Sequence, residues 1–158
     1  MRLDKIKGIN NCTLINDSYN SDVNSLSIAL DLLKKQTAQK MKTLILSDIK
    51  QCRRQKNRLY ESVAEMIRES RIDKLIGIGP ELNQRQKIFS VPGEKCFYRS
   101  TEAFLQQMKN SDFSSEAILI KGAREFAFER ISRRLQQKKH RTRLEINLEA
   151  LVHNLNFF

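Results

Sequence analysis

Short apolar segments alternate along the chain with longer segments of helical periodicity. The apolar runs fall at residues 13–17, 42–48, 73–79, 95–100 and 116–123. Runs of this length are typical of buried strands in a parallel sheet. The segments between them, from Asp22 onward and at 57–70, 101–110 and 124–137, are predicted to be helices. This alternation predicts a Rossmann-like, doubly wound α/β fold, with a mostly parallel sheet of about five to six strands and helices on both faces.

Local signals mark where some of these elements begin. Ser21 or Asp22 can cap the first helix, because their side-chain oxygens can accept a hydrogen bond from a free backbone N–H of its first turn. Pro80 suits the first turn of a helix after the third run. Residues 2–8 precede the first run and are expected to add an edge strand or hairpin to the sheet.

An unusually polar stretch, Asn16 to Ser21, separates the first predicted strand from the first predicted helix. Capping and turn formation use only two or three of its groups, which leaves Asp17 and Tyr19 unexplained. In sheets of this class, ligands bind beyond the carboxyl ends of the strands. Polar groups project from that edge at 16–21, 47–48, 79 and 121–124, and we expect them to form one binding site.

The charge of the chain is strongly positive, with a formal net charge of +11. Basic residues cluster at 50–58 and 133–143. Such clusters could neutralise nucleic-acid phosphates, form a solvated surface, or face an anionic ligand or partner domain. One functional alternative is therefore a non-catalytic α/β binding module that uses a basic face on nucleic acid or an acidic partner.

Several other classes of function find no support in the sequence. No apolar run approaches the roughly 20 residues that a membrane-spanning helix requires, and the N-terminus lacks the apolar centre of a signal peptide. Cys12, Cys52 and Cys96 are widely spaced, a pattern that fits reduced thiols in the cytoplasm. No phosphate-binding P-loop and no metal-ligand spacing is present. We expect a cytoplasmic protein without a membrane or metal site of its own.

Three motifs resemble those of the C-terminal domain of the Mur ligases, the ATP-dependent amide-forming enzymes of peptidoglycan synthesis. Asp17, Tyr19, Asn20 and Ser25 match the family's D-x-Y-N-A-N-P-x-S, although residues 21–23 depart from it. The segment 44–49 matches the family's strand ending in G-D-M, with Ser47 for Gly and Asp48 retained, while the E-L-G that follows is replaced at 51–53. The segment 118–124 matches I-L-V-K-G-S-R.

The resemblance covers about residues 2 to 136 and includes Arg2, which matches the arginine that closes on the nucleotide. The resemblance is strongest to the family member that adds D-Ala-D-Ala to UDP-N-acetylmuramoyl-tripeptide. In that reaction ATP phosphorylates the tripeptide carboxylate, and the amine of D-Ala-D-Ala attacks the acyl phosphate. The resemblance implies that a central domain holds ATP and magnesium, that an N-terminal domain holds the UDP-sugar, and that nucleic acid is no partner.

The resemblance also implies roles for individual residues. It assigns ATP binding to Arg2, Asp17, Tyr19 and Asn20, and acceptor binding to Lys121, Arg124, Ser25 and Asp48. It assigns no catalytic and no metal-binding residue to this chain, so the chain alone is expected to be inactive. As residues of a sheet edge, Arg2, Asp17 and Lys121 are expected to be replaceable with little effect on folding.

Residues 137–158 are expected to form a linker and the truncated start of a second domain. The sequence "TRLEINLEALVHNLNFF" at 142–158 resembles the opening strand and helix of alanine racemase. Pyridoxal phosphate, the cofactor of that enzyme, would bind only in the missing racemase part. We expect this tail to be mobile or loosely packed.

Overall fold

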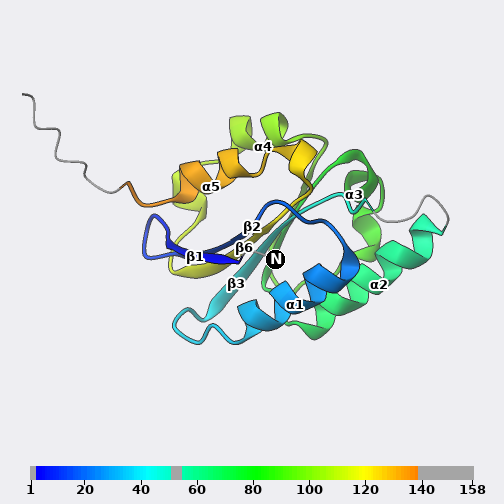
Figure 1. The fold of residues 1–158 in the computed structure, drawn as a ribbon, viewed down its shortest axis with the longest axis horizontal. Helices are drawn as coiled ribbons and strands as arrows, with labels where there is room; N and C mark the ends of the chain where they lie inside the picture. The colour runs from blue at the N-terminus through cyan, green and yellow to red at the C-terminus, as the bar shows by residue number, and fades with distance from the viewer. Residues whose placement is uncertain (1–2, 51–54, 139–158) are drawn as a thin grey trace, which may run out of the picture.

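The computed structural model describes residues 3–50 and 55–138, whose strands form one six-stranded sheet. The strands are β1 (Asp4–Lys7), β2 (Thr13–Asp17), β3 (Met41–Ser47), β4 (Lys74–Ile78), β5 (Lys95–Tyr98) and β6 (Glu116–Lys121). Their order in the sheet is β1-β2-β6-β3-β4-β5 (Figure 1). β1 runs antiparallel to β2 and all other pairs are parallel. The predicted fold class and the edge hairpin are confirmed.

Five α-helices within the described residues cover the sheet. They are α1 (Val23–Lys34), α2 (Lys56–Glu69), α3 (Pro80–Gln84), α4 (Thr101–Gln107) and α5 (Glu129–Leu135). Figure 1 shows α1 and α2 on one side of the sheet and α4 and α5 on the other. None of the helices in the described ranges is long and apolar enough to cross a membrane.

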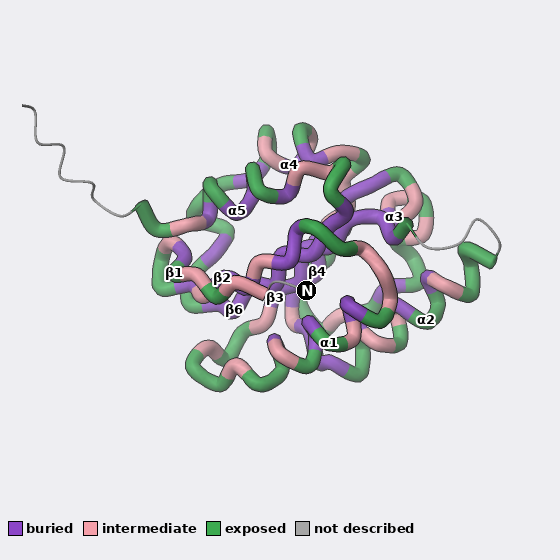
Figure 2. Tube along the Cα trace, in the orientation of Figure 1, coloured by how far each residue is buried: buried purple, intermediate pink, exposed green. Residues whose placement is uncertain are grey.

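Two apolar cores lie on opposite faces of the sheet, because successive side chains of a strand point to opposite sides. On β6, Leu119 packs into the core shared with α1, α2 and α3, whereas Ile118 and Ile120 pack into the core beneath α4 and α5. All six residues of β6 are buried. Figure 2 shows the buried positions concentrated along the central strands. A strand buried on both faces explains the continuous apolar run in the sequence.

The predicted helix at 124–137 is shorter than its apolar pattern indicates. The chain after β6 first forms a 3₁₀ turn, Arg124–Phe126, and α5 begins only at Glu129. Between them Ala127 has a φ of 50°, which reverses the chain direction. The Phe128 ring lies so close to Gly122 that a Cβ there would be 2.5 Å from the ring. Packing of this ring therefore decides where the helix starts. The predictions for Arg2, Cys52 and residues 139–158 lie outside the described residues.

The N-terminus of α1 is capped by Asp22, as predicted. One carboxylate oxygen accepts a hydrogen bond from the backbone N–H of Ser25 at 2.8 Å, and the other accepts one from the Ser25 hydroxyl at 2.8 Å. The hydrogen bonds from the Ser25 backbone and hydroxyl lower the pKa of the Asp22 carboxyl. This cap connects the polar stretch 16–21 rigidly to α1.

Replacing Asp22 with alanine should lower the free energy of unfolding by about 1 kcal/mol at neutral pH, because the cap is lost. The folded-state pKa lies below its ordinary value of 3.8. The contribution of the cap is therefore present above that value and is lost as the pH falls through the lowered pKa. Urea titrations across the acid range should show the difference between wild type and variant shrinking with falling pH. Asp22→Asn, which keeps a capping oxygen, should retain most of the stability; an equal loss in both variants would contradict the assignment.

Candidate functional site at the carboxyl edge of the sheet

The carboxyl ends of β2, β6, β3 and β4 meet at one edge of the sheet. Asp17 lies beside Lys121 in the register of β2 and β6, Lys121 lies beside Leu46 of β3, and Ser47 lies beside Ile78 of β4. Parallel pairing produces this arrangement, because every parallel strand ends on the same side. The four polar groups that the sequence places at this edge therefore do come together.

Asp17 and Lys121 form a buried ion pair at the centre of this edge. Lys121 Nζ lies 2.7 Å from Asp17 Oδ2 and also donates to the backbone carbonyl of Asn20 at 2.7 Å. Both charged side chains are only 1% exposed. The expectation of little effect on folding assumed an exposed sheet edge, and this pair is instead buried, so we expect loss of either residue to destabilise the fold.

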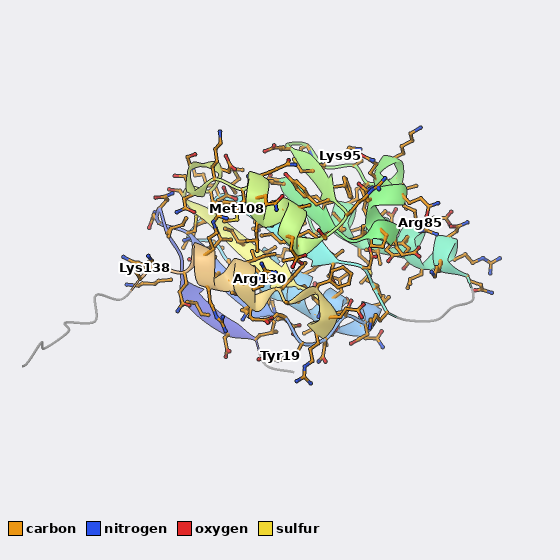
Figure 3. The ribbon with its side chains drawn as sticks, turned by 90° about the horizontal axis from the view of Figure 1, so that it is seen from above. Tyr19, Arg85, Lys95, Met108, Arg130 and Lys138 are labelled. Atoms are coloured by element: carbon orange, nitrogen blue, oxygen red, sulfur yellow. The ribbon has the colours of Figure 1, made fainter. Side chains whose placement is uncertain are left out.

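The segment 18–21 is also fixed on the side of β3. The Ser21 hydroxyl donates to the backbone carbonyl of Asp48 at 2.8 Å, and the Lys50 N–H donates to the carbonyl of Ser21 at 3.3 Å. In contrast, the side chain of Tyr19 is 68% exposed, and Asn20 is also exposed. Figure 3 shows Tyr19 at the outer margin of the molecule. The segment is thus held by hydrogen bonds to residues at the strand ends, and it presents a phenol ring and an amide to solvent.

Asp48 uses its side chain to start α3. Its two carboxylate oxygens accept hydrogen bonds from the backbone N–H groups of Glu81 at 3.0 Å and Leu82 at 2.8 Å. Burial raises the pKa of the Asp48 carboxyl, although these two hydrogen bonds oppose the shift. Gly79, which precedes α3, has a φ of +136° and lies against the same carboxylate. The Asp48 carboxylate is therefore buried and bound to backbone N–H groups, and it does not face solvent.

The remaining predicted site residues are likewise either buried and bound to protein groups or exposed to solvent. Ser25 is buried and its hydroxyl donates to Asp22, so it belongs to the cap of α1. Arg124 is exposed at the start of the 3₁₀ turn after β6. Its neighbour Glu125 forms an ion pair with Lys50 across the edge. The side chains of Tyr19, Asn20 and Arg124 are the exposed members of the predicted set within the described residues.

Ser47 belongs to the polar groups expected at this edge, although no ligand role was assigned to it. Its hydroxyl oxygen accepts a hydrogen bond from the backbone N–H of Ala123 at 2.8 Å and donates to the Asp48 carbonyl at 3.0 Å. Ser47 thereby joins the end of β3 to the chain that leaves β6. Its position directly before Asp48, where the motif has glycine, is the signal that points to it.

Several cations of the two basic clusters bind groups of the protein itself. Lys56 lies 2.6 Å from a carboxylate oxygen of Glu81. Arg134 donates to the backbone carbonyls of Leu105 and Met108, at 2.5 and 2.8 Å, and so caps the C-terminal end of α4. These basic residues therefore have structural roles within the protein, which account for part of the positive charge without a bound ligand.

The site offers little for metal or thiol chemistry. Across residues 3–50 and 55–138, no group of three or more His, Cys, Asp or Glu side chains is arranged to hold a metal ion. Cys12 and Cys96 are free thiols, and burial raises the pKa of each. Both are therefore protonated at neutral pH and are poor nucleophiles. The exposed phenol, amide and guanidinium groups are suited to binding rather than to bond-making.

Solved structures with a similar fold come from peptidoglycan ligases. MurF from Acinetobacter baumannii matches with a TM-score of 0.69 and 18% identity, over 87% of this chain and 30% of that one. MurF from Thermotoga maritima, solved in complex with ADP, gives 0.61 and 13%, over 84% of this chain and 30% of that one. A domain assigned to a UDP-N-acetylmuramate:L-alanyl-γ-D-glutamyl-diaminopimelate ligase of Haemophilus ducreyi gives 0.56 and 18%, over 85% of this chain and 96% of that one.

Sequence comparison identifies the same group of proteins. The UDP-N-acetylmuramoyl-tripeptide–D-alanyl-D-alanine ligase of Escherichia coli K12 is 25% identical over 138 residues, which are 86% of this chain. The chain spans 29% of the length of that relative. Residues 1–124 match the family described as Mur ligase, glutamate ligase domain. This match extends over most of the chain and agrees with its fold. The chain therefore belongs to the Mur ligase family and corresponds to its glutamate ligase domain.

Proposed function

We propose that this chain is the C-terminal domain of an ATP-dependent ligase that adds D-Ala-D-Ala to UDP-N-acetylmuramoyl-tripeptide. The E. coli relative is named for that activity. The observation that carries the proposal is the arrangement at the carboxyl edge, where exposed Tyr19 and Asn20 are held over the buried Asp17–Lys121 pair. These residues belong to the motif on which the resemblance rests.

The exposed residues are the ligand contacts in this proposal. Tyr19 and Asn20, with Arg2, face the nucleotide, and the guanidinium of Arg124 offers paired donors to the carboxylate of D-Ala-D-Ala. The sequence also assigns ligand contacts to Asp17, Ser25, Asp48 and Lys121. Their side chains bind protein groups instead, and they contribute by holding the exposed residues in place.

The chemistry of ATP activation belongs to other domains. No P-loop occurs in the 158 residues. Magnesium and the phosphates of ATP are therefore held by a central ligase domain, and the UDP-sugar by an N-terminal one. ATP and the UDP-linked substrate are polyanions, so a net charge of +11 favours their approach. A reaction that consumes these two substrates takes place in the cytoplasm.

Titration of the 158-residue chain with ATP, followed by D-Ala-D-Ala, should perturb NMR amide signals at 17–22 and 121–125. The chain alone should release no phosphate from ATP, because it has no P-loop. Arg124→Gln should weaken the response to D-Ala-D-Ala by about tenfold, the cost of one charged hydrogen bond. Arg133→Gln, which removes another exposed arginine, is the matched control and should change nothing.

Other outcomes of the same titration would contradict the proposal. Perturbations confined to α5, with no response at the carboxyl edge, would place ligand binding elsewhere. Tight binding of duplex DNA that falls steeply with salt would favour a nucleic-acid-binding module instead. Phosphate release by the purified chain would contradict the assignment of ATP chemistry to another domain.

We also propose that residues 1–136 form the ligase domain and that 137–158 form a basic linker and the start of an alanine racemase-like domain. The resemblance of 142–158 to the opening strand and helix of that enzyme supports this. Pyridoxal phosphate would then bind to a later part of the racemase. The coding sequence that follows Phe158 in the gene decides between such a fusion and a short tail.

A further inference from the structure

We propose that Lys121 is a positioning residue, which fixes the segment 18–21 from below and does not itself contact a ligand. This inference rests on the proposed function, because it explains how the nucleotide-facing residues Tyr19 and Asn20 are held. It differs from the role that the family resemblance suggests for Lys121, a direct contact with the acceptor.

The contacts of the ammonium group carry the inference. An ammonium has three N–H donors. Lys121 uses one on Asp17 Oδ2 and one on the carbonyl of Asn20, each at 2.7 Å. Asp17 ends β2 and Asn20 lies three residues later, so one side chain joins the end of the strand to the exposed middle of the segment. A ligand could reach this group, whose side chain is 1% exposed, only if the segment opened.

Tyr19 and Asn20 are exposed, so they bury little side-chain surface that would fix them, whereas Ser18 before them is buried. Among the described residues, further hydrogen bonds lie at the two ends of the segment: the Gly122 N–H donates to the Asp17 carbonyl at 3.3 Å, the Ser21 hydroxyl donates to the Asp48 carbonyl, and the Lys50 N–H donates to the Ser21 carbonyl. The contact between Lys121 and the Asn20 carbonyl therefore fixes the middle of the segment, where the two exposed side chains lie.

The chain contains a close match to Lys121 at the other end of the sheet. Lys74 begins β4, is 5% exposed, and donates to the backbone carbonyl of Asp112 at 2.8 Å. Its Nζ lies 3.8 Å from a carboxylate oxygen of Glu94. Lys74→Met and Lys121→Met thus each remove a buried ammonium that donates to a backbone carbonyl, one far from the candidate site and one within it.

The experiment compares these two variants in the 158-residue chain by urea denaturation, NMR backbone order parameters and NMR titration with ATP. Both variants should lose stability. Lys121→Met should in addition lower the NMR backbone order parameters of residues 19–21, from about 0.85 for rigid backbone toward about 0.6 or less, and weaken ATP binding by about tenfold. Lys74→Met should leave both local properties as in the wild type. Lys121→Arg, which keeps the charge and its donors, should restore part of the order.

A double variant, Asp17→Leu with Lys121→Met, separates positioning from stability. Replacing a buried ion pair by apolar residues often preserves stability. The contact with the Asn20 carbonyl is still lost, so the segment should remain mobile, with low order parameters, in a stable protein. This variant also decides the question if Lys121→Met alone does not fold.

Wild-type order parameters at 19–21 in a folded Lys121→Met variant would overturn the proposal. Loss of the response to D-Ala-D-Ala with an unchanged segment would do so as well, and would make Lys121 a ligand contact. If the wild-type chain shows no response to ATP at the carboxyl edge, the proposed function fails. The comparison of order parameters would still decide whether Lys121 positions the segment.

Discussion

Replacing Asp17 with alanine should lower the free energy of unfolding by about 3–5 kcal/mol, the usual cost of breaking a buried ion pair. The substitution leaves the Lys121 ammonium, 1% exposed, without its carboxylate partner. The charge can then be satisfied only by admitting water to the strand ends, where Lys121 is also bound to the Asn20 carbonyl. Urea denaturation at neutral pH, with the m-value compared with that of the wild type, measures the loss.

The double variant Asp17→Leu with Lys121→Met is the control for this prediction. It removes both charges, and apolar side chains of similar length fill the space between β2 and β6. We expect its stability to lie within about 2 kcal/mol of the wild type, because neither desolvated charge remains. If Asp17→Ala alone cost less than about 1 kcal/mol, the pair would have to be solvated in the native protein.

Replacing Gly79 with alanine should cost on the order of 3 kcal/mol, from two effects at one position. Its φ of +136° lies in a region that L-residues rarely adopt, which costs about 1–3 kcal/mol. A Cβ at this position would also lie 2.3 Å from Cγ of Asp48, so the carboxylate must move. Moving it breaks its hydrogen bonds to Glu81 and Leu82, which cap α3 and are worth about 1 kcal/mol.

Thermal and urea denaturation of Gly79→Ala and Asp48→Asn together separate the two effects. Asp48→Asn keeps the glycine backbone and one acceptor oxygen, so it should cost only about 1 kcal/mol. The difference between the two variants then measures backbone strain and displacement of the carboxylate. Equal losses in both variants would show that the cap alone matters and that position 79 tolerates a side chain.

The site is built so that charged residues support the exposed ones. Asp17 and Lys121 pair beneath the segment 18–21, Asp48 starts α3, and Asp22 starts α1. The exposed, ligand-facing side chains are then carried on a backbone that is already fixed. Holding a binding segment in its working geometry lowers the entropy lost when a ligand binds.

The order of the elements could be predicted from the sequence because it depends on short-range patterns. Each apolar run long enough for a strand became one, and the cap at Asp22 follows from local hydrogen bonds. The helix after β6 is the exception. It begins only after a 3₁₀ turn and a residue of positive φ, Ala127, and Phe128 packs there against Gly122, a contact that periodicity does not encode.

The sequence by itself also determined that Asp17, Asp48 and Lys121 lie at one edge, since parallel strands share the side on which they end. Only the tertiary structure decided which of these polar side chains remain free. Asp17 and Lys121 are 104 positions apart, and their pairing depends on β2 and β6 becoming neighbours in a sheet order that does not follow the chain. Burial at the edge depends in turn on the segment 18–21 folding back over them. Motif residues can therefore be located from sequence, but their division into supporting and ligand-facing groups requires the packed sheet, because a buried charge must find its partner within the protein.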